Sequence, residues 1–226
     1  MPISEIPELW NWGEFYCPWT YIAVTRLEKI APEYAGRVRV IERFFPLEVY
    51  GGGPPDRFVL DQEWWLAAIQ EPAALFRPYT NPEWPTTTLP AFEAVWCARQ
   101  QDDAAANALD LRIRRAFFAE NTNIARRDIY PQLARESGLE VSPFTRLFES
   151  GQARDAVLAE GRLGKEQYRV RGTPTLMLRS GQRLRHPMAY PHMENDKIVS
   201  IPPLPCCGES CYEVTRQFFE QALAGE

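Results

Sequence analysis

The sequence lacks the features that place a protein in a membrane or on a nucleic acid. No stretch of its 226 residues approaches the roughly 20 uncharged apolar residues that a helix needs to cross a bilayer. The formal net charge is -5 and no run of five or more basic residues occurs, so we expect neither a membrane nor a nucleic acid as a partner. Residues Met1–Leu9 lack the basic segment that begins a secretory signal, which predicts a cytoplasmic protein with reduced thiols.

The chain also has little cysteine, and it contains no internal repeat or low-complexity segment. Its composition, with 45% hydrophobic and 24% charged residues, is that of an ordinary globular protein. The length fits one domain with an insertion or two small domains, and it is long enough to bury a core without disulfides. The five cysteines are therefore expected to be reactive or ligating rather than structural.

The most informative segment is Cys17-Pro18-Trp19-Thr20, which lies where the apolar stretch Leu9–Trp12 gives way to a helical pattern. Proline is favoured in a first helical turn, so Cys17 is predicted at a strand-to-helix junction. Unpaired backbone N–H groups and the helix dipole at such a position stabilise a thiolate, which predicts an exposed thiol with a lowered pKa. The alternative is that Cys17 is a small buried apolar residue, as many free cysteines are.

The rest of the chain reads as a mixed α/β protein. Alternating β-branched and aromatic residues predict a strand over Arg37–Phe45, and the cluster Gly51–Pro55 predicts a loop after it. A further strand that opens at Pro174 is predicted within Val170–Leu178, with a hairpin partner in Gln182–Ala189. Helices are predicted over Ala23–Tyr34, Asp61–Ile69, Leu89–Gln100, Ala104–Glu120, Arg127–Ser137, Gln152–Gln167 and Tyr212–Leu223. This order describes a small sheet interrupted by a helical insertion.

Two motifs and the helical block between them resemble the DsbA family of the thioredoxin superfamily, most closely its FrnE-type and 2-hydroxychromene-2-carboxylate isomerase-like branch. The first motif is Cys17-Pro18-Trp19-x-Tyr21-Ile22, and the second is Val170–Thr175. The resemblance implies an α/β, thioredoxin-like fold with a helical insertion domain. We expect residues 1–58 and 168–226 to form the thioredoxin-like domain and residues 59–167 the inserted helical domain.

The resemblance also implies the residues of a site. Thr173-Pro174 would be a cis peptide beside the Cys17 sulfur, with the backbone of Thr173 pairing with an extended substrate segment. The alternative for Pro174 is an ordinary proline at the start of a strand. Glu14 occupies a place where relatives often carry an acidic group, and it is a candidate for moving protons to and from the thiol. The alternative for Glu14 is a solvated charge at a strand end.

The sequence departs from the family at Thr20, where dithiol members carry a second cysteine. Their second thiol attacks the mixed disulfide formed by the first, and a hydroxyl cannot do so. We therefore predict a thiol–disulfide oxidoreductase that works from Cys17 alone, with no tightly bound cofactor and with protein thiols, protein disulfides or glutathione as partners. Alternatives are a glutathione-dependent isomerase or transferase acting on a small aromatic substrate, and a non-catalytic binding module. A homodimer is one option for its assembly.

The remaining thiols fall into two groups. Cys206, Cys207 and Cys211 lie just before the last predicted helix, and one of them is a candidate for the resolving thiol that Thr20 does not supply. Some FrnE-type relatives carry a Cys-x4-Cys pair with the spacing of Cys206 and Cys211. A zinc site completed by His186, His192 or a carboxylate is a competing interpretation. We predict that the protein has no metal site. Cys97 lies beside an apolar stripe and is predicted to be a core residue.

Overall fold

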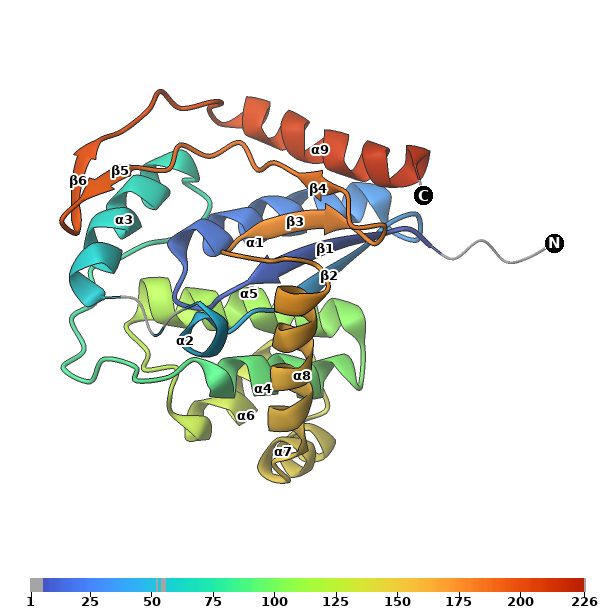
Figure 1. The fold of residues 1–226 in the computed structure, drawn as a ribbon. Coiled ribbons are helices and arrows are strands. Elements are labelled where there is room, and N and C mark those ends of the chain that lie inside the picture. Colours follow the sequence, from blue (N-terminus) through green and yellow to red (C-terminus); the bar gives the residue numbers. More distant parts are fainter. Residues whose placement is uncertain (1–5, 52, 54–55, 226) are drawn as a thin grey trace.

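The computed structural model describes residues 6–51, 53 and 56–225. Part of the stretch Met1–Leu9 and part of the predicted loop Gly51–Pro55 lie outside the described residues. Within this part of the chain, strands β1 (Glu8–Gly13), β2 (Arg39–Phe44), β3 (Thr175–Leu178) and β4 (Arg183–Leu184) form one sheet in the order β2-β1-β3-β4 (Figure 1). Strands β1 and β2 are parallel, and the other two pairings are antiparallel.

Helices follow and separate these strands. The described elements are α1 (Pro18–Ile30), η1 (Ala31–Tyr34), α2 (Leu47–Tyr50), α3 (Arg57–Gln70), α4 (Leu89–Arg99), α5 (Asp103–Glu120), η2 (Arg127–Ile129), α6 (Tyr130–Glu136), α7 (Val141–Glu149), α8 (Gln152–Glu166) and α9 (Glu209–Ala224). A small hairpin of β5 (His192–Glu194) and β6 (Lys197–Ser200) lies beside α3 (Figure 1). Among the described helices, none is both long and apolar enough to span a bilayer.

The sheet is covered on both faces. On one face, apolar side chains such as Leu9 pack with those of α1 and α9, including Leu27 and Phe219. On the other face, Trp10 and Trp12 pack with Met177. Helix α8 approaches this second face so closely that a Cβ atom at Gly164 would lie 2.6 Å from the Trp12 ring. Only glycine fits at that position without moving the tryptophan.

A third apolar cluster joins α1 to the helices between β2 and β3. It contains Tyr16, Cys17 and Trp19 from the start of α1, together with Phe92 of α4 and Phe117 of α5. The helical range 59–167 therefore shares a core with residues of the thioredoxin-like ranges. The division into two domains stays a prediction.

Most predicted elements are confirmed, with some boundaries moved. The strand predicted over Arg37–Phe45 is β2, and the helix predicted over Asp61–Ile69 extends over α3. The partner strand predicted over Gln182–Ala189 is wrong beyond its start, since only the two residues of β4 pair with β3. Pro187 has no N–H for a strand ladder, so the pairing could not have continued through the predicted range. Helix α7 and the β5–β6 hairpin were not predicted.

One buried carboxyl gives the fold a testable dependence on pH. Glu28 lies on α1, and within the described structure its Oε1 atom has no hydrogen-bond partner. Burial, and secondarily the charge of Asp110, raise the pKa of Glu28 from 4.5 to about 7. The folded state thus binds more protons than the unfolded state between these two values, so this group makes stability fall as the pH rises through that window.

We therefore expect Glu28→Gln to raise the free energy of unfolding by about 1–3 kcal/mol at pH 8 and by less than about 0.5 kcal/mol at pH 4.5. Denaturant unfolding at the two pH values measures this difference. The control is Glu166→Gln, which changes an exposed carboxylate on α8 and should leave stability within about 0.5 kcal/mol. Equal stability of Glu28→Gln and the wild type at pH 8 would show that the buried carboxylate is not costly.

Candidate active site

Cys17 is the residue that caps the N-terminus of α1. Its backbone is extended, with φ -79° and ψ 112°, and the N–H of Thr20 donates to its Sγ atom at 3.4 Å. Pro18 takes the first helical position, where its missing N–H leaves no bond unmade. The predicted junction between β1 and α1 is therefore confirmed.

The segment before β3 lies against this sulfur. The Thr173-Pro174 peptide bond is cis, and the Cys17 thiol donates to the carbonyl oxygen of Thr173 at 3.3 Å. The hydroxyl groups of Thr20 and Thr173 also face the sulfur. Neither hydroxyl makes a hydrogen bond of good geometry with any of the described residues. The structure thus brings Cys17, Thr20 and Thr173 together, although they come from both ends of the chain.

The prediction of an exposed thiol with a lowered pKa is wrong for this structure. Cys17 is only 7% exposed, and burial raises the pKa of its thiol. The N–H and hydroxyl of Thr20 and the hydroxyl of Thr173 lower the pKa, but desolvation is the larger effect. The sequence pattern indicated the helix terminus correctly and gave no sign of what covers it.

Residues 187–190 are tied to α1 and α3 close to the site, and Tyr190 lies near Cys17. The ring of Tyr190 meets the ring of Trp19 edge to face, with centroids 5.1 Å apart. Arg26 of α1 donates to the carbonyl oxygen of Pro187 at 3.1 Å. The side-chain amide of Gln70 donates to the Ala189 carbonyl at 3.0 Å and accepts from its N–H at 2.8 Å. These bonds hold the segment down beside the thiol.

Glu14 is fully buried, so the alternative of a solvated charge is wrong. Its carboxylate accepts hydrogen bonds from the backbone N–H groups of Phe15 (2.6 Å), Tyr16 (3.3 Å) and Leu47 (2.6 Å). Burial nevertheless raises its pKa to about 7. Glu14 therefore ties the turn before Cys17 to the start of α2. Its role as a proton carrier stays a prediction.

Two charged residues of the helical range reach the site and were not predicted from the sequence. Arg114 of α5 donates to the backbone carbonyl of Glu14 at 2.7 Å and pairs with Asp110 at 2.6 Å, and its positive charge lies near the Cys17 sulfur. Glu63 of α3 lies beside the Trp19 side chain, and burial raises its pKa. The negative charge of Glu63 raises the pKa of the Cys17 thiol. Nothing in either helical pattern indicates this proximity.

The C-terminal cysteines are placed at the start of α9. Cys206 and Cys211 form a disulfide, whereas Cys207 is free and exposed. The Cys206 sulfur lies 3.7 Å from the carbonyl oxygen of Pro187, in the segment that ends at Tyr190. A redox role for these three residues stays a prediction. Cys97 is buried, as the sequence predicts.

The zinc interpretation does not fit this arrangement. Zinc binds thiolates, and the sulfurs of Cys206 and Cys211 are bonded to each other. His186 and His192 do not complete a site with them, because the described residues contain no group of three or more His, Cys, Asp or Glu side chains placed to hold a metal ion.

Comparison with known proteins agrees with this geometry. The model of the DSBA-like thioredoxin domain family matches residues 8–193. The chain belongs to the DSBA-like thioredoxin domain family. The predicted resemblance to the DsbA family and the predicted thioredoxin-like α/β fold are both confirmed. No curated protein matches the chain significantly.

Solved structures of DSBA-like proteins share this fold at low sequence identity. A protein of Nitrosomonas europaea, provisionally described as a protein disulfide isomerase, is 23% identical with a TM-score of 0.70, and the match covers 96% of this chain and 99% of that one. The cytosolic disulfide reductase DsbM of Pseudomonas aeruginosa, solved with GSH, is 24% identical with a TM-score of 0.65 over 79% and 89% of the two chains.

A third solved structure with this fold is a 2-hydroxychromene-2-carboxylate isomerase, 18% identical with a TM-score of 0.56 over 75% of this chain and 84% of that one. Likenesses at this identity establish the fold alone. Membership of the DSBA-like family supports the prediction of an enzyme of the thiol–disulfide oxidoreductase type.

Proposed function

We propose that this DSBA-like protein is a cytoplasmic thiol–disulfide oxidoreductase that works from the single thiol of Cys17, with glutathione as its co-substrate. The observation that carries the proposal is the position of Cys17 Sγ, which accepts from Thr20 N at 3.4 Å and lies 3.3 Å from Thr173 O beside the cis bond. The residue at position 20 has a hydroxyl in place of a second thiol, so a small external thiol has to complete the cycle.

The cycle balances with glutathione alone. The Cys17 thiolate attacks the glutathione sulfur of a protein–glutathione mixed disulfide, and the electron pair of the broken S–S bond leaves on the substrate sulfur, which takes up a proton. A second glutathione thiolate then attacks the glutathione sulfur bound to Cys17. Oxidised glutathione leaves and Cys17 is regenerated. One mixed disulfide and one glutathione thereby become one protein thiol and one oxidised glutathione.

Donors already surround the position that the thiolate charge occupies. The N–H of Thr20 and the hydroxyls of Thr20 and Thr173 face the sulfur, and the positive charge of Arg114 lies nearby. Hydrogen bonds to a charged sulfur favour ionisation. Thr20 therefore supplies an alcohol that stabilises the thiolate in the position where a dithiol enzyme holds its resolving sulfur.

Ionisation of Cys17 also requires relief from burial and an acceptor for its proton. Movement of Tyr190 away from Trp19 would admit water to the sulfur and lower its pKa, because desolvation is the main cause of the raised value. Glu63 is the acidic group that we assign to receive the proton. Glu63 lies beside Trp19, and its negative charge raises the pKa of the Cys17 thiol. Burial raises the pKa of Glu63 itself.

Formation of a glutathione adduct tests the proposal. We use a Cys207→Ser background, in which Cys17 and the buried Cys97 are the free thiols. After incubation with oxidised glutathione, intact mass and peptide mapping should find one glutathione on Cys17. Because the thiolate is the nucleophile and the pKa of Cys17 is raised, the rate constant should increase by about tenfold per pH unit from pH 6 to 8 without a plateau.

Two results would contradict the proposal. Absence of an adduct on Cys17 would remove the one-thiol cycle. A rate that is already constant above pH 6 would show an ionised thiol at rest, in conflict with the closed arrangement described above.

A further inference from the structure

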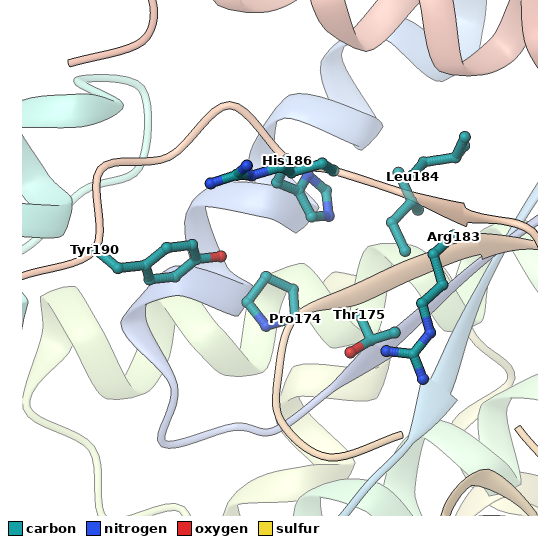
Figure 2. A pocket seen from close by; sticks show the side chains of 8 residues that line it. Pro174, Thr175, Arg183, Leu184, His186 and Tyr190 are labelled. Atoms are coloured by element: carbon teal, nitrogen blue, oxygen red, sulfur yellow. The ribbon is translucent and has the colours of Figure 1, made fainter. Parts of the chain in front are cut away.

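A cavity of about 260 Å³ lies on the side of Pro174 that faces β4 and residues 185–190. Figure 2 shows the ring of Pro174 at its floor, with the hydroxyl end of Tyr190 directed toward it from one side and the ring of His186 above it. Thr173, the residue before Pro174, has its carbonyl oxygen 3.3 Å from Cys17 Sγ. The Thr173-Pro174 peptide therefore has the Cys17 sulfur next to its carbonyl oxygen and the cavity next to its proline ring.

One wall of the cavity contains a polar group that the protein leaves unused. His186 is 5% exposed, and its Nε2 atom finds no hydrogen-bond partner among the described residues. Burial, with the charge of Arg26, lowers its pKa to about 3, so the imidazole is neutral. Native proteins rarely leave a buried polar atom unpaired, and an exception calls for a partner such as a ligand.

The charge of the lining selects the sign of that ligand. Arg183 and Arg185 both contribute to the lining, and none of the described residues around the cavity is acidic. Arg183 already donates to the carbonyl oxygens of Tyr168 and Arg169. Arg185 is exposed, and its positive charge acts to lower the pKa of the Tyr190 hydroxyl. A guanidinium is well suited to a carboxylate, which it binds through two parallel hydrogen bonds.

The volume limits the size of the bound group. Sites for drug-sized ligands usually measure about 300–1,000 Å³, so a cavity of about 260 Å³ holds one amino-acid-sized arm rather than a whole bicyclic aromatic compound. An occupant whose sulfur lies at Cys17 would reach the cavity with an arm that passes Pro174. The occupant thus needs a sulfur that reaches Cys17 and a negatively charged arm that fits the cavity. A small thiol compound with an acidic arm meets both requirements.

We infer that this cavity is the anchoring subsite for a carboxylate-bearing arm of an acidic low-molecular-weight thiol, with Arg185 as the charged partner and His186 as a hydrogen-bonding partner. The inference rests on the proposed function, because it is the reaction at Cys17 that brings such a thiol here. Arg185 and His186 act on the affinity for the thiol compound and have no part in the exchange of sulfur.

The reactivity test compares an acidic with a neutral disulfide. In the Cys207→Ser background, adduct formation on Cys17 is timed with oxidised glutathione and with hydroxyethyl disulfide, which has no carboxylate. We expect Arg185→Gln to slow the reaction with oxidised glutathione by about tenfold, since one charge-assisted contact is lost, and the reaction with hydroxyethyl disulfide by less than about twofold. Arg162→Gln, an exposed charge change on α8, should alter neither rate. Equal effects of Arg185→Gln on the two probes would overturn the subsite.

A binding test separates this inference from the proposed function. S-methylglutathione is titrated calorimetrically into the Cys17→Ser protein, which cannot form an adduct. Arg185→Gln and His186→Phe should each weaken binding by about three- to tenfold, and Arg162→Gln should not. Unchanged binding in Arg185→Gln, or no binding at all, would overturn the subsite. If S-methylglutathione binds through Arg185 while Cys17 reacts with neither disulfide, the subsite stands and the proposed function is wrong.

Discussion

Replacing Cys17 by Ser is expected to reduce kcat/KM for a glutathionylated peptide by at least about 10³-fold, which corresponds to about 4 kcal/mol of transition-state stabilisation. The loss follows from chemistry, because a serine hydroxyl is not ionised near neutral pH and forms no bond to sulfur in an exchange reaction. A coupled assay of oxidised glutathione production measures it. No other thiol substitutes for Cys17 in the proposed cycle.

The same substitution is expected to leave the fold intact. Cys17 caps α1 by accepting from Thr20 N, and serine is among the preferred residues at this position. The free energy of unfolding should therefore stay within about 1 kcal/mol of the wild type. Cys207→Ser, which removes an exposed thiol outside the site, serves as the matched control and should retain activity. More than a tenth of wild-type activity in Cys17→Ser would refute the one-thiol mechanism.

The Cys17→Ser protein also separates an enzyme from a binding module. A module that only docks partners beside Pro174 should hold them equally well with serine at position 17. Catalysis should not survive. Loss of turnover with retained partner binding assigns the function to the thiol.

The second large effect is expected from Thr20→Cys. This change restores the dithiol pattern of the family, and we expect an internal disulfide with Cys17 and at least a tenfold increase in insulin reduction with dithiothreitol and no glutathione. Space is available, because a sulfur replaces both the methyl and the hydroxyl of Thr20. The fit on this side is close. A Cβ atom added at Gly13 would lie only 2.7 Å from the methyl carbon of Thr20.

Thr20→Ser is the control for this gain. It keeps the hydroxyl that faces Cys17 and adds no sulfur, so it should retain the glutathione-dependent reaction and show no gain with insulin. If Thr20→Cys forms no internal disulfide on oxidation, the two positions are not aligned for exchange, and the family's two-thiol geometry does not hold in this chain.

Local patterns predicted most of the helices and strands, whereas the thioredoxin-like fold was predicted from the family resemblance. The helices of the insertion follow apolar repeats that also face a core, so periodicity alone indicated α4 and α5. Helix α7 was not predicted, although it has nine residues, and Pro143 lies in its first turn, where a proline is compatible with a helix. The β5–β6 hairpin is mostly exposed and polar, which leaves no alternation to recognise.

The site was predictable in its identity and not in its environment. Cys17, Thr173 and Pro174 could be found because motifs mark them, whereas the burial of Cys17 results from a cluster that includes residues distant in sequence, such as Phe92 and Met188. A pKa is set by all groups around an atom, and a sequence window does not contain them. Glu63 and Arg114 were missed for the same reason.

The turn that precedes Cys17 depends on residues that the sequence assigns to another domain. The hydroxyl of Tyr16 donates to the carbonyl of Pro85 at 2.7 Å, and Arg114 donates to that of Glu14. A truncated protein or a chimera with a foreign helical range would lose both supports at the reactive residue. Residues 59–167 thus support the turn at Cys17, and any transplant of this turn into another protein has to carry these helices along with it.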